Sequence, residues 1–300
     1  MSDRQARLAQ EYDAARPRLV RVAYAILGSR AEAEDVVADC WLRLVGAEER
    51  EPVRDVLGWA TVAVSRAALD VLRSARVRRE AYVGPWLPEP VVTSPDPADR
   101  VTLDDSVRYA LLVVLEQLSP AERTAWVLHD LFGMPFAEVA TAVGRTPDAV
   151  RQLASRARRH VASGTPRLDV DRSAHDRVVA AFAAAAAGGD LTALVHTLDP
   201  AVVLTSDGGG VVNAARRPVL GPDRVARFLL GTLGRPTAAT VETVAVNGVT
   251  GFAVVEPDGR VSTVLSLTVD GDLVTRVDLV RAPDKLAGIA LGSDAGRART

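Results

Sequence analysis

The chain has 300 residues, of which 48% are hydrophobic, so it is long enough to bury a sizeable core and to divide into two or three domains. Its formal net charge of −2 excludes a global electrostatic attraction to nucleic acid, and any DNA affinity must come from local patches. Cys40 is the single cysteine, which excludes intrachain disulfides and cysteine-based zinc sites.

The first block, residues 5–80, has helical hydrophobic spacing throughout. Ser29 and Glu32 have the spacing of a capping box and predict the start of a helix, which Gly46 is expected to end. The apolar stripe of this helix carries Val36, Val37, Cys40, Trp41 and Leu44. Cys40 is therefore expected to be an inert core residue. A second, longer helix is predicted over about residues 57–79.

Residues 81–103 are predicted to form a proline-rich linker. Prolines 85, 88, 90, 95 and 97 forbid a regular helix and favour an extended, semi-rigid path. A plain tether is small and polar, but this one carries Tyr82, Trp86 and Leu87 near its start. We therefore expect it to pack on another part of the chain.

The next block, residues 104–162, is again helical. Ser119 and Glu122 have the spacing of a capping box ahead of a mostly apolar helix. His129 falls in the middle of that helix, and no second ligand stands near it in sequence. We expect a structural histidine rather than a metal ligand.

The end of this block has the pattern of a helix-turn-helix. Gly144 is predicted to close one helix, and Thr146 and Pro147 to open the next. Val150, Leu153, Ala157 and Val161 recur at helical spacing and are expected to face inward. The outward face consists of Arg151, Gln152, Ser155, Arg156, Arg158 and Arg159. These donors suit phosphates and base edges, although an arginine-rich solvated helix of a bundle gives the same pattern.

The third block, residues 173–290, changes from helices to strands. Helices are predicted over about 173–187, from about 191, and near 222–233. Strand-like runs cover 201–206, 241–248, 250–257, 260–271 and 273–280, and the turns at 257–259 and 270–271 indicate hairpins. Helices followed by an antiparallel sheet predict an α+β domain with its helices on one face.

No catalytic constellation is recognisable in the third block. The candidates for acid-base chemistry are His175, His196, Asp199 and Asp207, and their spacing matches no known arrangement. Asp207 begins the run Asp207-Gly208-Gly209-Gly210, which lacks the context of a nucleotide-binding loop. This run is predicted to be a turn that permits positive φ or a close backbone approach.

Several of these segments resemble extracytoplasmic-function sigma factors of bacterial RNA polymerase. Residues 27–45 resemble the region-two helix that docks on the polymerase. Residues 58–80 resemble the helix that reads the −10 element, and residues 118–161 resemble region four, which reads the −35 element. The third block is similar to SnoaL-like domains of the NTF2-like cone fold. The runs YVGPWLPEP (82–90), SDGGGVVNAARRPVLG (206–221) and APDKL (282–286) resemble the sigma-J-like subgroup, which carries such a domain at its C-terminus. Ala282 departs from the asparagine usual there, which puts any contact of that side chain in doubt.

The resemblance implies a role for each matching residue. Polymerase docking is assigned to Asp35, Asp39, Trp41 and Arg43, with Trp41 expected to pack rather than to make the contact. Promoter contact near −10 is assigned to Arg66, Arg73, Arg76, Arg78 and Arg79, while Asp70 is expected to form a structural ion pair with Arg66 or Arg73. Contact with the −35 duplex is assigned to the outward face at 151–159 described above.

The resulting prediction is a multi-domain protein: two all-α sigma domains, the second with a helix-turn-helix, and then a SnoaL-like cone. It is expected to bind core RNA polymerase and promoter DNA in the cytoplasm, with no cofactor, metal or membrane contact and no reaction of its own. The cone is expected to regulate in cis, docking on the sigma domains or their linker, and its apolar interior offers room for a small hydrophobic ligand. The residues assigned to this docking are Tyr82, Trp86, Leu87, Asp207, Gly208, Gly209, Gly210, Asp284, Lys285 and Leu286. Two alternatives stay open: a ligand-responsive dimeric helix-turn-helix regulator, and an NTF2-like enzyme with a DNA-binding appendage.

Overall fold

A computed structural model describes residues 3–80, 82, 84–93, 107–164, 171–233 and 238–291. The chain divides into two compact units. The first contains residues 1–81 and 111–165, and the second contains residues 82–110 and 166–300. The proline-rich linker therefore belongs to the same unit as the C-terminal sheet. No helix within the described ranges combines the length and the apolar character that crossing a membrane requires.

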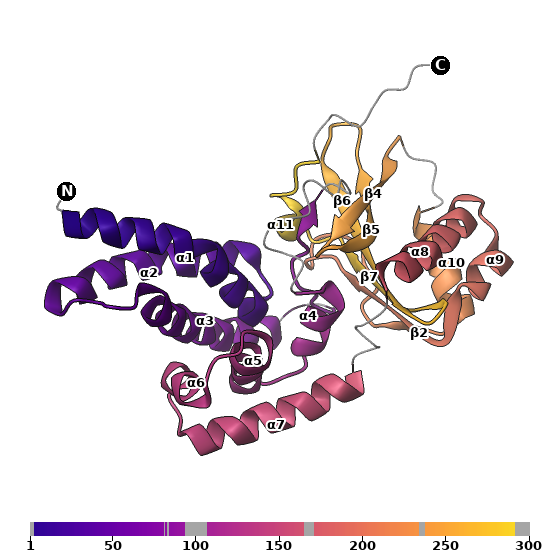
Figure 1. Ribbon diagram of the computed structural model, residues 1–300. Coiled ribbons are helices and arrows are strands. Elements are labelled where there is room, and N and C mark those ends of the chain that lie inside the picture. The colour runs from indigo at the N-terminus through magenta and orange to yellow at the C-terminus, as the bar shows by residue number, and fades with distance from the viewer. Residues whose placement is uncertain are drawn as a thin grey trace. The chain divides into compact units, whose positions relative to one another are not determined.

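The first unit begins with three long helices, α1 (Asp3–Leu27), α2 (Arg30–Arg50) and α3 (Val56–Glu80), which pack against one another (Figure 1). As the capping pattern predicts, the Ser29 side chain accepts a hydrogen bond from the Glu32 amide at the start of α2. Leu19, Leu44 and Val64 supply fully buried side chains from each helix in turn. Burial of such aliphatic side chains is the main stabilising contribution in a three-helix core of this kind.

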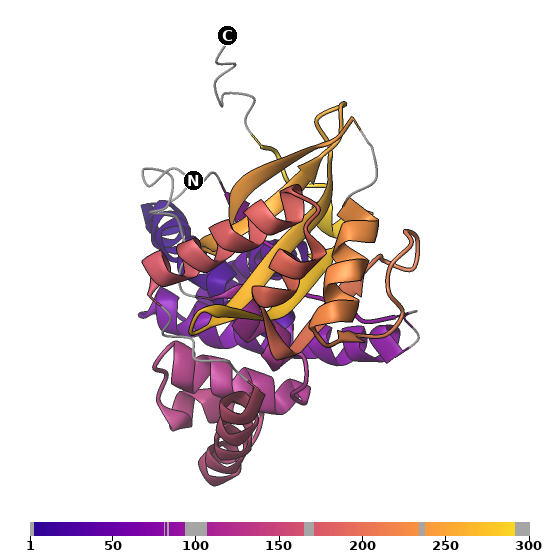
Figure 2. The same cartoon turned by 90° about the vertical axis from the view of Figure 1, so that its right-hand side faces the viewer.

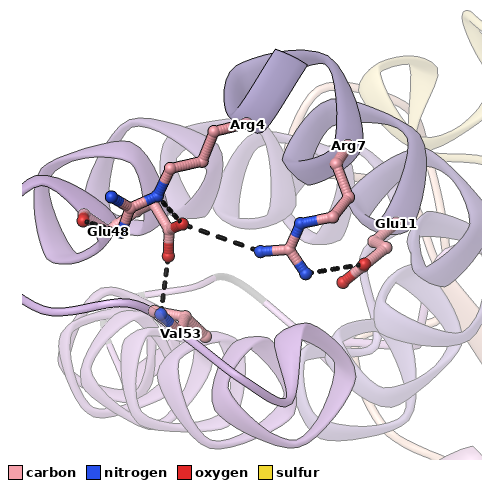
Figure 3. Close-up of polar contacts among 5 residues, drawn as sticks. All are labelled: Arg4, Arg7, Glu11, Glu48 and Val53. Carbon is pink, nitrogen blue, oxygen red and sulfur yellow. Dashed lines mark hydrogen bonds and ion pairs between the residues drawn. The ribbon is translucent and has the colours of Figure 1, made fainter. Parts of the chain in front are cut away.

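The prediction that Gly46 ends α2 is wrong, because the helix continues to Arg50. The buried Glu48 lies beyond that glycine and joins the helix to its neighbours (Figure 3). Arg4 Nε of α1 donates to Glu48 Oε1 at 2.6 Å, and the amide of Val53 donates to Oε2 at 2.6 Å. Arg7 lies 3.7 Å from the same carboxylate and also pairs with Glu11 at 3.1 Å. The hydrogen bond from Arg4, and then that from Val53, hold the pKa of Glu48 below its usual value.

The helix-turn-helix region follows α4 (Tyr109–Leu115). It contains α5 (Pro120–Trp126), a π-helical turn η2 (Val127–Leu131), α6 (Phe136–Val143) and α7 (Pro147–Gly164). The capping box of Ser119 and Glu122 is complete. Gly144 ends α6 in the left-handed conformation, with φ of 69°, and the Thr146 hydroxyl accepts from the amide of Ala149 at 3.3 Å at the start of α7.

Within the first unit, α3 contacts α5 and α6, and α1 contacts η2. Arg123 of α5 is 1% exposed and lies in this contact. Its Nε donates to the backbone carbonyl of Ala25 at 3.1 Å, and it pairs with Glu116. A buried guanidinium needs such partners because removing its charge from water is costly.

The second unit is a seven-stranded sheet in the order β1-β4-β5-β6-β7-β2-β3. Its strands are β1 (Val92–Thr93), β2 (Leu198–Asp207), β3 (Val219–Leu220), β4 (Thr240–Val246), β5 (Val249–Val255), β6 (Val261–Asp270) and β7 (Leu273–Val280). β2 and β7 are parallel and the other pairs antiparallel. The linker supplies the edge strand β1, which pairs with β4. The hairpins predicted at Gly259 and Gly271 are present, with positive φ at both glycines.

The described part of the second unit also contains the helices α8 (Arg172–Ala187), α9 (Leu191–His196), α10 (Pro222–Leu233) and α11 (Pro283–Leu286). In Figure 2, α8 (salmon) and α10 (orange) lie across one face of the sheet. Between helices and sheet lies an apolar core with Phe182, Leu229 and Leu204 among its members. This is the predicted α+β arrangement, with helices on one face, but the expectation of a purely antiparallel sheet is wrong, because β2 and β7 are parallel.

Candidate functional site

The exposed face of α2 combines charge with one exposed apolar side chain. Asp35, Asp39 and Arg43 are all exposed, and they share a face because they lie four and eight residues apart. Leu42 is on the same face and is 71% exposed. The resemblance to known motifs did not single out Leu42. Its position three residues after Asp39 and next to Arg43 could have indicated that it lies on the same outward face. Trp41 is half-buried and lies 5.4 Å from the Tyr12 ring, as its predicted packing role requires.

A second exposed face lies on α3. Arg66, Asp70 and Arg73 are exposed, and Arg73 Nη1 pairs with Asp70 at 3.1 Å, which is the predicted ion pair at i+3. The pair is solvent-exposed on both sides and stabilises the helix by about 0.2–0.5 kcal/mol. Arg76, Arg78 and Arg79 belong to the helical part of α3, but their side chains lie outside the described residues.

The third face is that of α7, and all six predicted outward residues are exposed. On the opposite side Val150, Ala157 and Val161 are buried as predicted. Leu153 is only half-buried, and Ala154, which the pattern did not single out, is fully buried.

Three of the α7 arginines are tied to acidic side chains of the same domain. Arg158 Nε lies 2.5 Å from Asp130 of η2, and Arg156 Nε lies 2.8 Å from Glu122 of α5; Arg151 pairs with Asp148. The pairs of Arg156 and Arg158 join α7 to α5 and η2, whereas that of Arg151 lies within α7. Each guanidinium has five donors, so others stay available. By contrast, Gln152, Ser155 and Arg159 make no ion pair or side-chain hydrogen bond with the described residues.

Glu122 is a junction between the start of α5 and α7. Its carboxylate accepts from Ser119 as well as from Arg156. Burial opposes ionisation, but these hydrogen bonds hold the pKa of Glu122 below its usual value.

His129 of η2 contacts the residues that precede and begin α6: its Nδ1 lies 2.8 Å from the carbonyl of Met134, and its ring stacks on Phe136. Its predicted structural role is in line with these contacts.

The second unit contains a buried polar cluster that holds the linker on the sheet. Asp207, at the end of β2, is 0% exposed. The Tyr82 hydroxyl donates to its Oδ1 at 2.5 Å, and the amide of Leu87 donates to its Oδ2 at 2.8 Å. Lys285 Nζ, from α11, donates to the same Oδ2 at 2.6 Å and to the Leu87 carbonyl at 2.5 Å. Lys285 also lies 3.9 Å from the centre of the Trp86 ring, within the range of a cation–π contact. We call these five residues the linker lock.

The electrostatics of the linker lock favour a charged pair. Burial alone raises the pKa of Asp207, but the charge of Lys285 and the hydrogen bond from Leu87 outweigh it and hold the pKa below its usual value. Burial, and then the bond to the Asp207 carboxylate, raise the pKa of the Tyr82 hydroxyl. The Asp207 carboxylate is therefore charged at neutral pH, and it accepts hydrogen bonds from Tyr82, Leu87 and Lys285. A buried charge needs such partners to avoid a large desolvation cost.

The remaining residues of the predicted docking set lie around this cluster. Gly209 has φ of 71°, and a side chain on it would meet Ala282 at 3.2 Å and Asp284 at 3.6 Å. Gly208 has no room for a side chain, because a Cβ there would lie 2.1 Å from the Val212 carbonyl. Gly210 is exposed and Leu286 is buried.

A second attachment, which the sequence reasoning missed, holds the linker at Val91 and Val107. The buried Asn247 sits at the β4–β5 hairpin with φ of 46°. Its Oδ1 accepts from the amide of Val91 and its Nδ2 donates to the carbonyl of Val107, both at 3.1 Å. The Tyr109 hydroxyl donates to the Pro88 carbonyl at 2.8 Å. The pair Asn247-Gly248 is a hairpin signal, but nothing local in it indicates a partner more than 130 residues away.

The acid-base candidates of the second unit are engaged in structural contacts or exposed. Asp207 belongs to the linker lock, and the His175 Nε2 lies 3.2 Å from the Leu267 carbonyl. Asp199 accepts from the amide of Ala201, and His196 is exposed at the end of α9. Within the described ranges, no three His, Cys, Asp or Glu side chains gather as a metal site would need.

Comparisons with known proteins match this arrangement. Residues 12–78 match the family model for sigma-70 region 2, and residues 108–161 match that for sigma-70 region 4. The chain is 46% identical over 229 residues to the ECF RNA polymerase sigma factor SigJ of Mycobacterium tuberculosis, covering 75% of this chain and 73% of that protein. It is 37% identical over 275 residues to the probable ECF RNA polymerase sigma factor SigI of the same species, covering 89% and 91%. The crystal structure of M. tuberculosis SigJ matches with a TM-score of 0.76 at 37% identity, covering 95% of this chain and all of that one.

Proposed function

Because this chain belongs to the extracytoplasmic-function family of RNA polymerase sigma factors, we propose a role for each exposed face described above. A sigma factor is an initiation factor that directs core RNA polymerase to promoters, and catalysis belongs to the polymerase. Both alternatives, the dimeric regulator and the enzyme with a DNA-binding appendage, lose their basis with this assignment. The protein is expected to work in the cytoplasm, beside the polymerase.

The α2 face is the polymerase-docking surface. The observation that carries this proposal is the exposed Leu42 beside Asp35, Asp39 and Arg43. An apolar centre within complementary charges is the usual composition of a protein–protein interface. The charges steer the encounter and select the partner, while the leucine supplies apolar burial.

Charge exchange tests the docking proposal. The double variant Asp35→Arg/Arg43→Glu should lose co-elution with core polymerase while its thermal unfolding stays normal, because both side chains are exposed. The matched control is Asp223→Arg/Arg227→Asp, which exchanges an exposed i,i+4 pair on α10. Retained co-elution of the docking variant would assign docking to another surface.

The α3 and α7 faces contact the promoter. Arg66 and Arg73, with Arg76, Arg78 and Arg79, are assigned to the element near −10, and the α7 residues to the −35 element. The ion pairs of Arg156 and Arg158 support a positioning role beside any contact with DNA. Gln152, Ser155 and Arg159 have no such tie to the described residues, and they are the α7 side chains most readily turned toward bases.

The cone regulates by holding the linker. A free chain of about 28 residues reaches at most about 90–100 Å, so by itself it would not fix the separation of the two DNA-contacting domains. The linker lock and Asn247 fix the linker near both of its ends, directly after α3 and directly before α4. Such attachment sets the reach of the tether, and with it whether both promoter elements are engaged at once.

A small hydrophobic ligand inside the cone stays a prediction. The core packed between α8, α10 and the sheet consists of aliphatic and phenylalanine side chains, which supports an apolar rather than a polar guest there. Saturable binding of an apolar probe to the full chain, lost on filling this core with a Val202→Phe substitution, would support it.

A further inference from the structure

A cavity beside the linker lock has no part in the contacts described so far. It has a volume of about 210 Å³ and lies between the linker and the loop that follows β2. Gly84 contributes from the linker, and Ser206, Gly208 and residues 210–216 contribute from the cone. All of these residues belong to the second unit. The space exceeds what one water molecule needs.

The loop around the cavity is held in shape by its glycines. Gly209 and Gly210 both have left-handed φ, at 71° and 70°, and Gly208 accepts from the amides of Val211 and Val212 at 3.1 and 2.8 Å. On the other side, a Cβ on Gly84 would lie 3.7 Å from Arg216 Cα, so linker and loop are in direct contact beside the cavity.

Two polar groups in the lining point to a ligand. Ser206 is 1% exposed, and its Oγ has no hydrogen-bond partner among the described residues. A buried hydroxyl without a partner is costly, and native structures normally provide one or bind something there. Arg216 brings a guanidinium, which is exposed and forms no ion pair with any described side chain. Of the carboxylates near this loop, Asp207 is paired with Lys285, and Asp284 lies beside Gly209, where a Cβ would be 3.6 Å from its Oδ1.

We propose that this cavity binds a small oxyanion, a carboxylate or a phosphate. A guanidinium and a hydroxyl are a donor set that matches such an anion. The proposal goes beyond the proposed function, since it names a ligand for the contact between linker and cone. A ligand seated against Gly84 and Arg216 touches both sides of that contact and stabilises the docked linker. Val211, 81% exposed in the lining, offers an apolar contact to an organic acid.

Direct titration tests the site without using transcription. Full-length protein is titrated with inorganic phosphate and, separately, with isobutyrate, by isothermal calorimetry at constant ionic strength. Saturable binding of phosphate alone would identify an inorganic ligand, and binding of isobutyrate alone an organic acid; either supports the proposal. If neither anion binds saturably, the proposal is overturned.

Substitutions locate the binding. Arg216→Ala should weaken binding at least tenfold and Ser206→Ala about three- to tenfold, as expected for a lost hydrogen bond. The matched control Arg217→Ala removes a neighbouring exposed arginine that does not line the cavity, and it should bind as the wild type does. Equal affinity in Arg216→Ala and Arg217→Ala would show that the anion binds elsewhere.

Hydrogen exchange tests the link to the linker. If the ligand binds the docked form alone, a concentration one hundred times Kd should slow linker opening about 100-fold. The amides of Leu87 and Val91, both hydrogen-bonded to cone side chains, report that opening. Unchanged exchange at saturation would overturn the bridging role. Transcription without added ligand tests the proposed function separately.

Discussion

Removal of the lysine charge from the linker lock is the most informative single change. Lys285→Met keeps the length of the side chain but deletes the ammonium that pairs with Asp207 and donates to the Leu87 carbonyl. Breaking a buried ion pair by removing one partner costs about 3–5 kcal/mol. Asp207 retains hydrogen bonds from Tyr82, Leu87 and Gly209, so we expect the lower end, about 3 kcal/mol.

This free-energy cost is expected to appear as local opening of the linker rather than as unfolding of the whole unit. When the linker detaches from the sheet, the Asp207 carboxylate becomes hydrated and its desolvation cost is relieved. The linker is therefore expected to open before the sheet unfolds. A change of about 3 kcal/mol corresponds to a roughly 100-fold larger opening equilibrium. Exchange of the Leu87 and Val91 amides should therefore accelerate by about two orders of magnitude.

The pH dependence should change sign in the Lys285→Met variant. In the wild type the pKa of Asp207 is lowered, so its contribution is present above the unfolded pKa of about 3.9 and is lost as pH falls through the folded value. In the variant, burial is expected to dominate and raise the pKa. Docking of the linker should then improve as pH falls from 7 towards 5, whereas the wild type should be unaffected in that range.

The assay is hydrogen exchange read by mass spectrometry over residues 84–93, at pH 7 and, after correction for intrinsic rates, at pH 5. The control Arg260→Met removes the cation of an exposed pair whose separation is 3.9 Å, worth at most about 1 kcal/mol. It should leave linker exchange unchanged. Wild-type exchange in Lys285→Met would refute the view that the buried pair holds the linker.

Four further changes have defined outcomes. Arg158→Ala should weaken promoter-duplex binding by about 1–3 kcal/mol if the residue reads a base, or lower the salt slope by about one if it holds a phosphate; unchanged affinity at every salt concentration would mean a solvated face. Gly208→Ala should lower the urea midpoint, at a cost of about 1–3 kcal/mol, since its Cβ would lie 2.1 Å from the Val212 carbonyl; a wild-type midpoint would mean that the loop relaxes freely. Arg123→Met should destabilise the first unit by about 3 kcal/mol, because the guanidinium is buried and paired; a shift below 1 kcal/mol in chemical unfolding would contradict this. Deletion from Asp284 onward should alter transcription while polymerase binding persists, and wild-type output at equal protein level would leave the cone a passenger.

Local signals predicted most of the fold. The caps at Ser29, Ser119 and Gly144 lie where the sequence indicates, because capping depends on residues three or four apart. The strands and the hairpins at Gly259 and Gly271 follow from alternation and turn residues in the same way. Gly46 was misjudged because the local helix-ending signal is overridden by the contact between Glu48 and Arg4.

The parts of the site that join distant segments were less accessible. Motif resemblance grouped Tyr82, Asp207 and Lys285 in one docking set, but it did not indicate that they form a buried ion pair with a shared hydrogen-bond network. Asn247 was missed because its turn signal says nothing about the linker. The pairing of Arg156 with Glu122 is likewise invisible in sequence, since the two residues are 34 positions apart and lie on separate helices.

The proposed control of the tether by the cone is tested most directly by reconstituted transcription on promoters whose −35 and −10 elements are separated by different spacer lengths. Wild-type protein should show a sharp optimum, because the linker is held near both ends. Lys285→Met, at equal occupancy of core polymerase, should show a broader or displaced optimum. Superimposable profiles for the two proteins, with linker opening in the variant confirmed by hydrogen exchange, would contradict the account.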